Sequence, residues 1–210
     1  MTNAGTEGAP GVPQVVLVDV HDNPLGLAEK MQAHRGAGLL HRALSVFIVN
    51  RGGEMLLQRR ARHKYHSAQL WSNACCSHPE SGVPPVVAAQ ARLAEELGFT
   101  TPLLPAGTVS YRVDLGNGMT EWELDHLFVG EYSGTVQPNP REVDAIDWVR
   151  WEDLQARLRA RPGDYTPWFP IVLAALLRNA GQRLWWCQVR PGTVDSREAK
   201  GAAPGRAAGQ

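Results

Sequence analysis

The chain has 210 residues, enough for one domain with a substantial hydrophobic core, and its 43% hydrophobic and 20% charged residues are typical of globular proteins. Lys plus Arg and Asp plus Glu number 21 each, so the zero formal net charge gives no reason to expect nucleic acid or an anionic membrane as a partner. The three cysteines, Cys75, Cys76 and Cys187, do not form a disulfide framework, and we interpret them as thiols in a reducing compartment.

The two ends of the chain differ in composition from its middle. Residues 1–12 are rich in Gly, Pro and Thr and are expected to form a flexible leader without a signal-peptide pattern. Residues 191–210 are poor in large apolar side chains, and we expect disorder there. The longest apolar run, residues 171–177, is too short to span a bilayer. We therefore expect one domain over residues 13–190, in the cytoplasm and without a membrane partner.

Between these ends, strands dominate and helices lie between or after them. The predicted strands lie at residues 15–20, 44–49, 54–58, 110–115, 120–129 and 145–151. The predicted helices lie at residues 85–97, 152–160 and 168–180. Two hairpins follow from the turns Asn50-Arg51-Gly52-Gly53 and Gly116-Asn117-Gly118, and Gly98 is expected to end the first helix. The pattern predicts an α+β domain in which a mixed sheet packs against helices.

Paired carboxylates and scattered histidines suggest a metal site. Glu121 and Glu123 are two residues apart on a predicted strand and therefore project from the same face, where their charges repel unless a cation or proton lies between them. His34, His41 and His78 would complete a mixed nitrogen and oxygen ligand set that suits Mn²⁺, Zn²⁺ or Fe²⁺. Spacing alone does not bring these residues together, and a solvated strand face with structural histidines stays an alternative.

Three further segments have both a functional and a structural interpretation. Three interpretations apply to Cys75-Cys76-Ser77-His78: half of a zinc ribbon, a reactive thiol with a lowered pKa, or a pair of inert buried thiols. The zinc ribbon is weakly supported, because the second pair of ligands is missing. The basic run from Gln58 to Lys64 is either a solvated loop or a phosphate-binding loop. Glu95-Glu96 late on a helix opposes the helix dipole, which hints at a compensating basic group or cation.

Taken together, these segments resemble the type I isopentenyl-diphosphate isomerases, from about Val15 to Leu177. The pieces that carry the resemblance are Leu27-Ala28-Glu29-Lys30, His34, His41-Arg42-Ala43, Gln58-Arg59-Arg60-Ala61, Lys64, Leu70-Trp71-Ser72-Asn73-Ala74-Cys75-Cys76-Ser77-His78-Pro79, Glu95-Glu96-Leu97-Gly98, Tyr111-Arg112, Glu121-Trp122-Glu123-Leu124-Asp125 and Tyr165-Thr166-Pro167-Trp168. Each piece is short, but their order and spacing agree together. The resemblance implies a Nudix-type fold with a mixed sheet packed between helices.

The stretch before Gly98 also resembles a degraded Nudix box. In Nudix hydrolases the helix carries an Arg-Glu pair where this chain has Ala91 and Arg92. Arg92 thus replaces a carboxylate that is expected to help hold the hydrolytic metal. This departure argues against pyrophosphate hydrolysis and fits the isomerase branch.

The resemblance implies a role for each matching residue. The implied ligands of one Mn²⁺, Zn²⁺ or Mg²⁺ ion are His34, His41, His78, Glu121 and Glu123. The implied catalytic groups are the Cys76 thiol, Glu123 and its hydrogen-bonding partner Tyr111. Glu96 is the implied ligand of a Mg²⁺ ion that arrives with the diphosphate. The implied substrate contacts are Lys30, Arg60, Lys64 and Arg92 at the diphosphate and Trp168 at the isoprenoid tail. Trp71 is expected to help shield the carbocation.

The implied activity is the interconversion of isopentenyl and dimethylallyl diphosphate, by protonation of the alkene, a tertiary carbocation and deprotonation, in isoprenoid biosynthesis. We expect a monomer with a small-molecule substrate and no nucleic-acid partner. Two rivals remain at this point: a Nudix pyrophosphohydrolase, and a non-catalytic module in which Cys75, Cys76 and the histidines hold structural zinc.

Overall fold

A computed structural model of the protein describes residues 11–180. Cys187, the expected tail at 191–210 and most of the expected leader lie outside the described residues. Within residues 11–180, no helix combines the length and the apolar character that crossing a membrane requires.

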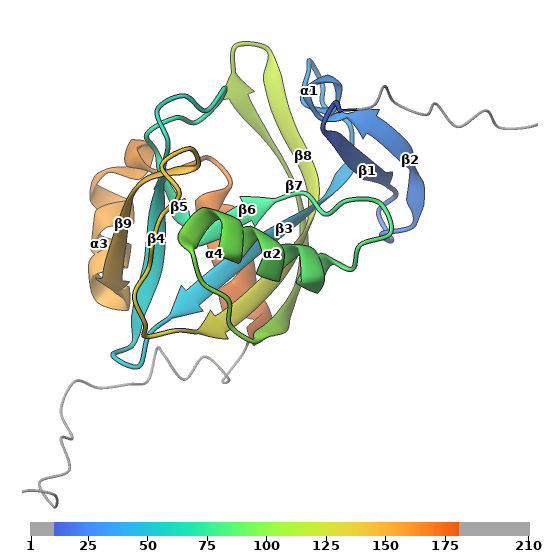
Figure 1. Cartoon of the computed structure of the whole chain (residues 1–210). Coiled ribbons are helices and arrows are strands. Elements are labelled where there is room, and N and C mark those ends of the chain that lie inside the picture. Colours follow the sequence, from blue (N-terminus) through green and yellow to red (C-terminus); the bar gives the residue numbers. More distant parts are fainter. Residues whose placement is uncertain (1–10, 181–210) are drawn as a thin grey trace, which may run out of the picture.

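A single mixed sheet organises the described residues. Its strands are β1 (Gln14–Val18), β2 (Pro24–Glu29), β3 (His41–Val49), β4 (Glu54–Arg60), β5 (Trp71–Asn73), β6 (Cys75–Ser77), β7 (Leu103–Gly116), β8 (Met119–Glu131) and β9 (Val143–Arg150). The helices are α1 (Lys30–Ala33), α2 (Pro85–Leu97), α3 (Trp151–Ala160), the 3-10 turn η1 (Pro162–Asp164) and α4 (Phe169–Ala180). The fold is therefore α+β, as the sequence predicts (Figure 1).

Strand β3 is the centre of the sheet. It runs parallel to β8 along its whole length and antiparallel to β1, β4 and β6. Strand β4 lies between β5 on one edge and β9 on the other, and β7 extends the sheet through its long hairpin with β8. Because β3 and β8 are far apart in sequence, their parallel pairing brings together residues that no local pattern connects.

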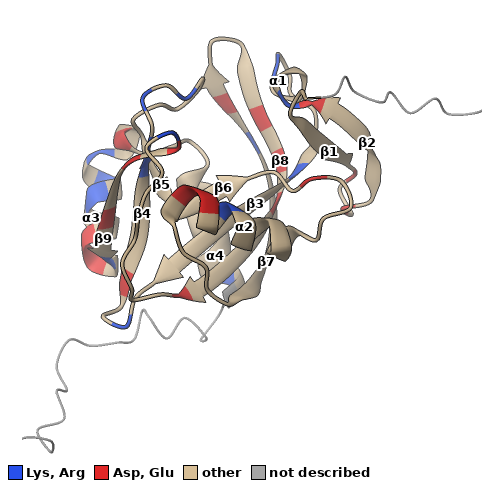
Figure 2. Ribbon diagram, viewed as in Figure 1, with Lys and Arg blue, Asp and Glu red and all other residues tan. Residues whose placement is uncertain are grey.

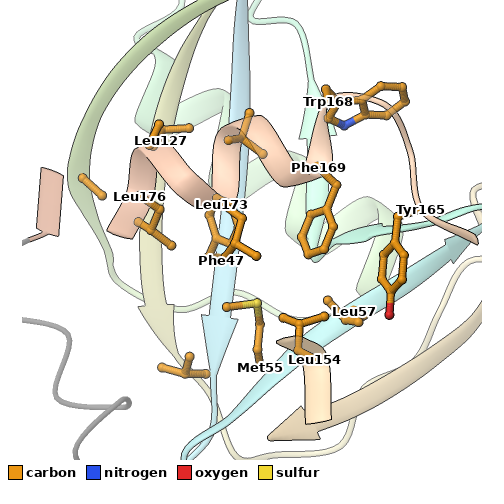
Figure 3. Packing of buried hydrophobic residues seen from close by; sticks show 14 of the residues in the cluster. Phe47, Met55, Leu57, Leu127, Leu154, Tyr165, Trp168, Phe169, Leu173 and Leu176 are labelled. Carbon is orange, nitrogen blue, oxygen red and sulfur yellow. The ribbon is translucent and has the colours of Figure 1, made fainter. Parts of the chain in front are cut away.

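The alternation of side chains along β3 explains why both faces of the sheet are covered. Leu44, Val46 and Ile48 belong to one buried cluster with α2. Phe47 and Val49 belong to another cluster with α3 and α4. Figure 3 shows this second cluster, with Phe47 near residues of α4 and Leu154 of α3. Since burying one such side chain contributes about 1.5–3 kcal/mol, the two layers hold the sheet between them. The expected packing between helices is confirmed.

Helix α2 has the bounds that its sequence predicts. Pro85 lies in its first turn, where a missing N–H costs nothing, and Gly98 ends it with φ 74°. Gly98 also approaches another segment closely, because a Cβ at this position would lie 2.8 Å from the carbonyl oxygen of Gln137. Ala89, Leu93 and Leu97 are buried on one face of the helix, which fixes it against the sheet.

The sequence pattern missed four short elements. Strand β2 contains Pro24 and Gly26, which are poor strand formers, and it exists because it pairs with β1. Helix α1 and strands β5 and β6 have only four, three and three residues, too few for a periodic signal. Strands β7 and β8 are 14 and 13 residues long, so the predicted hairpin was correct in place and too short.

Candidate active site and metal centre

Strand pairing positions the central residues of the candidate site. In the parallel register of β3 and β8, His41 lies beside Glu123. On the other side of β8, Tyr111 of β7 lies opposite Glu123. Strand β6 places Cys76 opposite Ser45 of β3. Four strands, β3, β6, β7 and β8, therefore bring a histidine, a thiol, a phenol and a carboxylate to one region of the sheet, and Figure 2 shows acidic residues along the β7–β8 hairpin.

Two histidines are held with one ring nitrogen facing inward. His34 donates from Nδ1 to the carbonyl oxygen of Lys30 at 2.7 Å, and His41 donates from Nδ1 to the carbonyl oxygen of Leu39 at 2.7 Å. A carbonyl oxygen only accepts, so the proton lies on Nδ1 and the Nε2 lone pair of each ring stays available. Both rings are fully buried. This is the tautomer that a metal-binding histidine needs.

The inward-facing atoms of His34 and His41 converge with His78 and Glu123, whereas Glu121 groups with His34 and His66. His41 Nε2 lies 3.1 Å from His78 Nε2, and His78 Nε2 lies 2.9 Å from Glu123 Oε1. His34 Nε2 and Glu121 Oε2 are buried without any hydrogen-bond partner. Donor atoms of His34, His41, His78 and Glu123 all lie within 4.8 Å of one another. Orphaned lone pairs and crowded carboxylates fit a divalent cation of the Mn²⁺ or Zn²⁺ type.

The two carboxylates differ in their proton affinity. Burial, followed by the charge of Glu123, raises the pKa of Glu121 well above its usual value. Burial alone would raise the pKa of Glu123 too, but hydrogen bonds and charge from His41 and His78 hold it well below its usual value. A buried like-charge pair of this kind is stabilised by a cation.

The Cys76 thiol lies in a polar cage. It donates to Asn73 Oδ1 at 3.0 Å and accepts from Trp168 Nε1 at 3.3 Å. Ser45 Oγ lies 3.5 Å from the sulfur and donates to the buried Asp125 at 2.7 Å. Burial, and then the charge of Asp125, raises the pKa of Cys76 to about 12. The thiol is therefore protonated at neutral pH, in contrast to the lowered pKa of the reactive-thiol interpretation.

Tyr111 and Glu123 form the second proton-bearing pair. The Tyr111 hydroxyl donates to Glu123 Oε2 in a short hydrogen bond, and the ring is buried. Burial and the neighbouring Glu123 charge raise the pKa of Tyr111 well above its usual value. Glu123 thus contacts the histidine cluster with one oxygen and the phenol with the other.

One pocket joins these groups to the basic residues. The residues that line it are Lys30, Gln58, Arg60, Lys64, Tyr65, His66, Cys76, Ser77, His78, Arg92, Glu96, Glu121, Glu123, Glu142 and Trp168. They include every residue that the resemblance implies for the substrate and for the diphosphate-bound Mg²⁺. His34, His41 and Tyr111 lie behind this lining and support it.

The basic run after β4 divides between the pocket and the surface. Arg60 and Lys64 line the pocket, whereas Arg59 and Arg62 form ion pairs with Asp144 at 2.6 and 3.9 Å. The phosphate-loop interpretation therefore applies to two residues of the run. Trp71 is not among the residues that line this pocket, and the Arg59 guanidinium lies 5.7 Å from the centre of its ring. Its suggested help in shielding the carbocation stays a prediction.

Arg92 explains the unfavourable glutamates at the end of α2. Its guanidinium donates to Glu95 at 2.7 Å and to Glu96 at 2.7 and 3.2 Å. Figure 2 shows the basic and acidic bands side by side on this helix. Cys75, fully buried, donates to Glu96 Oε1 at 3.4 Å. Among residues 11–180, the groups able to hold a metal contain histidine and glutamate without cysteine, which disfavours the cysteine-zinc rival.

Sequence reasoning missed two polar residues of the pocket. His66 lies with Nε2 3.7 Å from Glu121 Oε1 and shares a second metal-capable group with His34 and Glu121. Burial, followed by the charge of Arg60, lowers its pKa to about 2, so the ring is neutral. Glu142 lies in the loop before β9 and pairs with Lys64. Neither residue belongs to a local motif, so only the fold could have revealed them.

Comparison with known proteins identifies the family. Residues 39–169 match the NUDIX domain family model. A Pectobacterium atrosepticum protein named isopentenyl-diphosphate Delta-isomerase is 43% identical over 163 residues, which cover 78% of this chain and 90% of that relative. The chain belongs to the isopentenyl-diphosphate Delta-isomerase family. A second relative with this name, from Streptomyces griseus, is 43% identical over 176 residues and covers 83% of this chain and 88% of its own length.

Solved structures agree on the fold of this family member. A Deinococcus radiodurans protein aligns with a TM-score of 0.59 and 18% identity, over 70% of this chain and 90% of its own. A MutT protein from Methanosarcina mazei aligns with a TM-score of 0.54 and 20% identity, over 66% and 94%. At these identities the likeness concerns the fold alone, and it confirms the Nudix-type architecture.

Proposed function

We propose that this chain, as an isopentenyl-diphosphate Delta-isomerase, interconverts isopentenyl diphosphate and dimethylallyl diphosphate. The observation that carries the proposal is one pocket that holds the Cys76 thiol, the Glu123 carboxylate and four basic side chains, in a chain 43% identical to relatives of that name. The reaction moves a double bond, so one carbon gains a proton and another loses one. Two acid–base groups and an anion-binding end are the parts it needs.

The two acid–base groups are the Cys76 thiol and the Glu123–Tyr111 pair. The thiol is protonated at neutral pH because its pKa is raised to about 12, so it carries a proton that one of the two transfers can use. Glu123 bonds to Tyr111 through Oε2, so a proton can be shared between carboxylate and phenol. We assign one proton transfer to each group.

Trp168 is the aromatic wall beside the carbocation. Its ring is 2% exposed, its Nε1 donates to the Cys76 sulfur, and the ring also lines the pocket. The π face of a desolvated tryptophan stabilises a cation by about 2 kcal/mol. Its burial also keeps water from the cation, which water would otherwise capture.

The basic end of the pocket receives the diphosphate. Lys30, Arg60, Lys64 and Arg92 line it, and Arg forks and Lys point charges both suit phosphate oxygens. Glu96 is the proposed ligand of the Mg²⁺ ion that accompanies the diphosphate, since Mg²⁺ prefers one or two carboxylates together with substrate oxygens. Binding at this remote end holds the alkene against the acid–base groups.

His34, His41, His78, Glu121 and Glu123 are the proposed ligands of one divalent metal, Mn²⁺, Zn²⁺ or Mg²⁺. When bound, such an ion fixes the Glu123 side chain and tunes its acidity. The two inward Nε2 atoms and the unpartnered Glu121 Oε2 support this assignment. We also propose that the chain acts as a monomer in the cytoplasm, on a small-molecule substrate alone.

Pyrophosphate hydrolysis is the rival reaction. It requires a helix carboxylate where this chain has Arg92, and that guanidinium pairs with Glu95 and Glu96, the remaining acidic residues of the helix end. Positive charge at this position disfavours a cluster of hydrolytic metal ions.

Proton NMR with isopentenyl diphosphate and Mg²⁺ in D₂O tests the proposal. Wild-type protein should convert the substrate to dimethylallyl diphosphate with deuterium incorporation, and Cys76→Ala should nearly abolish conversion. An unchanged substrate spectrum from folded, metal-loaded wild-type protein would refute the isomerase. Release of inorganic phosphate in the same sample would point to hydrolysis.

A further inference from the structure

Glu142 lines the pocket and is one of several lining residues without a role in the proposed chemistry. Its Oε2 accepts a short hydrogen bond from Lys64 Nζ and lies 3.6 Å from Arg92 Nη2. A single carboxylate oxygen is thus shared by two of the four cations that line the pocket. The Glu142 side chain keeps 20% of its surface exposed, so it lies at the pocket wall within reach of a ligand.

The backbone holds this arrangement in place. Ala61 N donates to the carbonyl oxygen of Glu142 at 3.0 Å, and Lys64 N donates to the carbonyl oxygen of Ala61 at 3.1 Å. Both members of the ion pair are therefore tied to the same residue after β4. Glu142 N also donates to the carbonyl oxygen of Asn139 at 2.9 Å. The contact follows from rigid backbone geometry rather than from two long side chains meeting in solvent.

One anionic oxygen between a lysine and an arginine is the contact that a phosphate oxygen makes in a protein site. Burial alone would raise the pKa of Glu142. The hydrogen bond and charge of Lys64, together with the charge of Arg92, lower this pKa below its usual value. The carboxylate is therefore ionised and fully available to both cations at neutral pH. In this position the carboxylate makes the two contacts that a phosphate oxygen of the substrate would make.

We propose that Glu142 is an internal anion that occupies the diphosphate contacts of Lys64 and Arg92, and that the substrate must displace it to bind. The inference rests on the proposed function, which assigns these two cations to the diphosphate. Glu142 is then a specificity-determining residue. A single carboxylate on an incoming ligand merely exchanges with the one already there, whereas a diphosphate brings more charge and reaches both cations at once.

The crowding of positive charge explains why such an anion is useful. Burial first, then the charges of Lys64 and Arg60, lower the pKa of Lys30. Four cations around one pocket repel each other, and an internal carboxylate offsets that repulsion in the free protein. The same carboxylate competes with every anion that enters the pocket. It therefore lowers the affinity for anions of small charge more than the affinity for a diphosphate, which makes the pocket selective.

Glu142→Gln tests this inference because glutamine keeps the shape and a hydrogen-bonding oxygen but loses the charge. Asp144→Asn is the matched control: it removes a carboxylate two residues away that pairs with Arg59 and does not line the pocket. Calorimetric titration with inorganic pyrophosphate, with and without added Mg²⁺, gives the affinity of the whole protein for the diphosphate group. The isomerase assay gives KM and kcat separately.

Glu142→Gln should bind pyrophosphate more tightly than wild type by up to about fivefold, the range for one partly exposed charge pair. KM should fall by a similar factor with a smaller change in kcat, and the gain should shrink at high salt. Asp144→Asn should bind like wild type.

Unchanged or weaker pyrophosphate binding by Glu142→Gln, in an enzyme whose wild type is active, overturns this inference and leaves the isomerase function standing. Weaker binding only in the presence of Mg²⁺ also overturns it and assigns Glu142 to the metal instead. A folded wild-type protein without isomerase activity overturns the proposed function, and this inference falls with it.

Discussion

Glu121→Gln should change the stability of the metal-free and metal-loaded proteins in opposite directions. In the metal-free protein, Glu121 is 5% exposed, its Oε2 has no partner, and its nearest basic neighbour His66 is neutral because its pKa is about 2. Glu121 therefore experiences the charge of Glu123, and the charges of Arg60 and Lys30 offset only part of the effect of burial and of Glu123. Removing its charge should stabilise the metal-free fold by about 1 kcal/mol, the low end for a buried unsatisfied group.

The effect depends on pH in a defined direction. The pKa of Glu121 is raised in the folded protein by burial and then by Glu123, from a usual value of 4.5. Between the unfolded and folded pKa values the folded state binds more protons, so this group reduces stability as pH rises above about 4.5. Glu121→Gln does not titrate at this position, so its advantage over the wild type should increase from pH 4 toward pH 8.

With a divalent metal bound, the order should reverse. A free metal concentration of 100 times the dissociation constant stabilises the folded protein by about 2.7 kcal/mol. A variant that binds the metal about 100-fold more weakly loses most of this stabilisation at the same metal concentration. About 1 kcal/mol shifts Tm by about 2–4 °C in a chain of this size. Glu121→Gln should therefore melt about 2–4 °C above wild type without metal and about 3–5 °C below it with Mn²⁺.

Thermal unfolding followed by circular dichroism, with chelator and then with Mn²⁺, measures both shifts. Glu131→Gln is the control, because Glu131 lies on the same strand with its side chain 46% exposed. It should leave Tm nearly unchanged in both conditions. A Glu121→Gln variant that melts below the wild type equally with and without metal would refute the reasoning, since Glu121 would then be a structural residue only.

Three other variants test separate parts of the structure. Cys75→Ala should keep most isomerase activity, in contrast to Cys76→Ala, because Cys75 faces Glu96; equal loss from both would contradict the assignment of the thiol. Trp168→Phe removes the N–H donor to the Cys76 sulfur and should lower kcat with little change in KM; a change in KM alone would count against it. Gly98→Ala should lower the free energy of unfolding by more than about 1 kcal/mol, because the new Cβ is strained at a positive φ and lies too close to Gln137. Gly82→Ala is the control, since Gly82 has a similar φ and open space around it and should show the loss from strain alone. Equal losses of stability for the two variants in chemical denaturation would exclude the effect of the close contact.

Local sequence determined the elements whose signals lie within a few residues. Pro85 and Gly98 mark the ends of α2 because proline is tolerated only in the first turn and glycine accepts the left-handed backbone at the end. The two-residue spacing of Glu121 and Glu123 placed both carboxylates on one face of β8, since strand side chains alternate. Short elements without periodicity, such as β5 and β6, could not be found this way.

The family resemblance named most of the site, but it gave roles without geometry. It could not show that Cys76 is caged by Asn73 and Trp168, nor that its pKa is raised rather than lowered. Burial decides whether the pKa of Cys76 rises or falls, and the extent of burial is set only when the chain folds.

Glu142, His66 and the neighbours of Glu123 became visible only in the tertiary structure. Parallel pairing of β3 with β8 places His41 beside Glu123, 82 positions apart in the numbering. The loop before β9 carries Glu142 to Lys64 in the same way. Sequence determines which side chains the chain can offer and how each short segment folds. Which of them share a pocket depends on long-range strand pairing and packing, because only these contacts bring distant residues within the few ångströms over which charges and hydrogen bonds act.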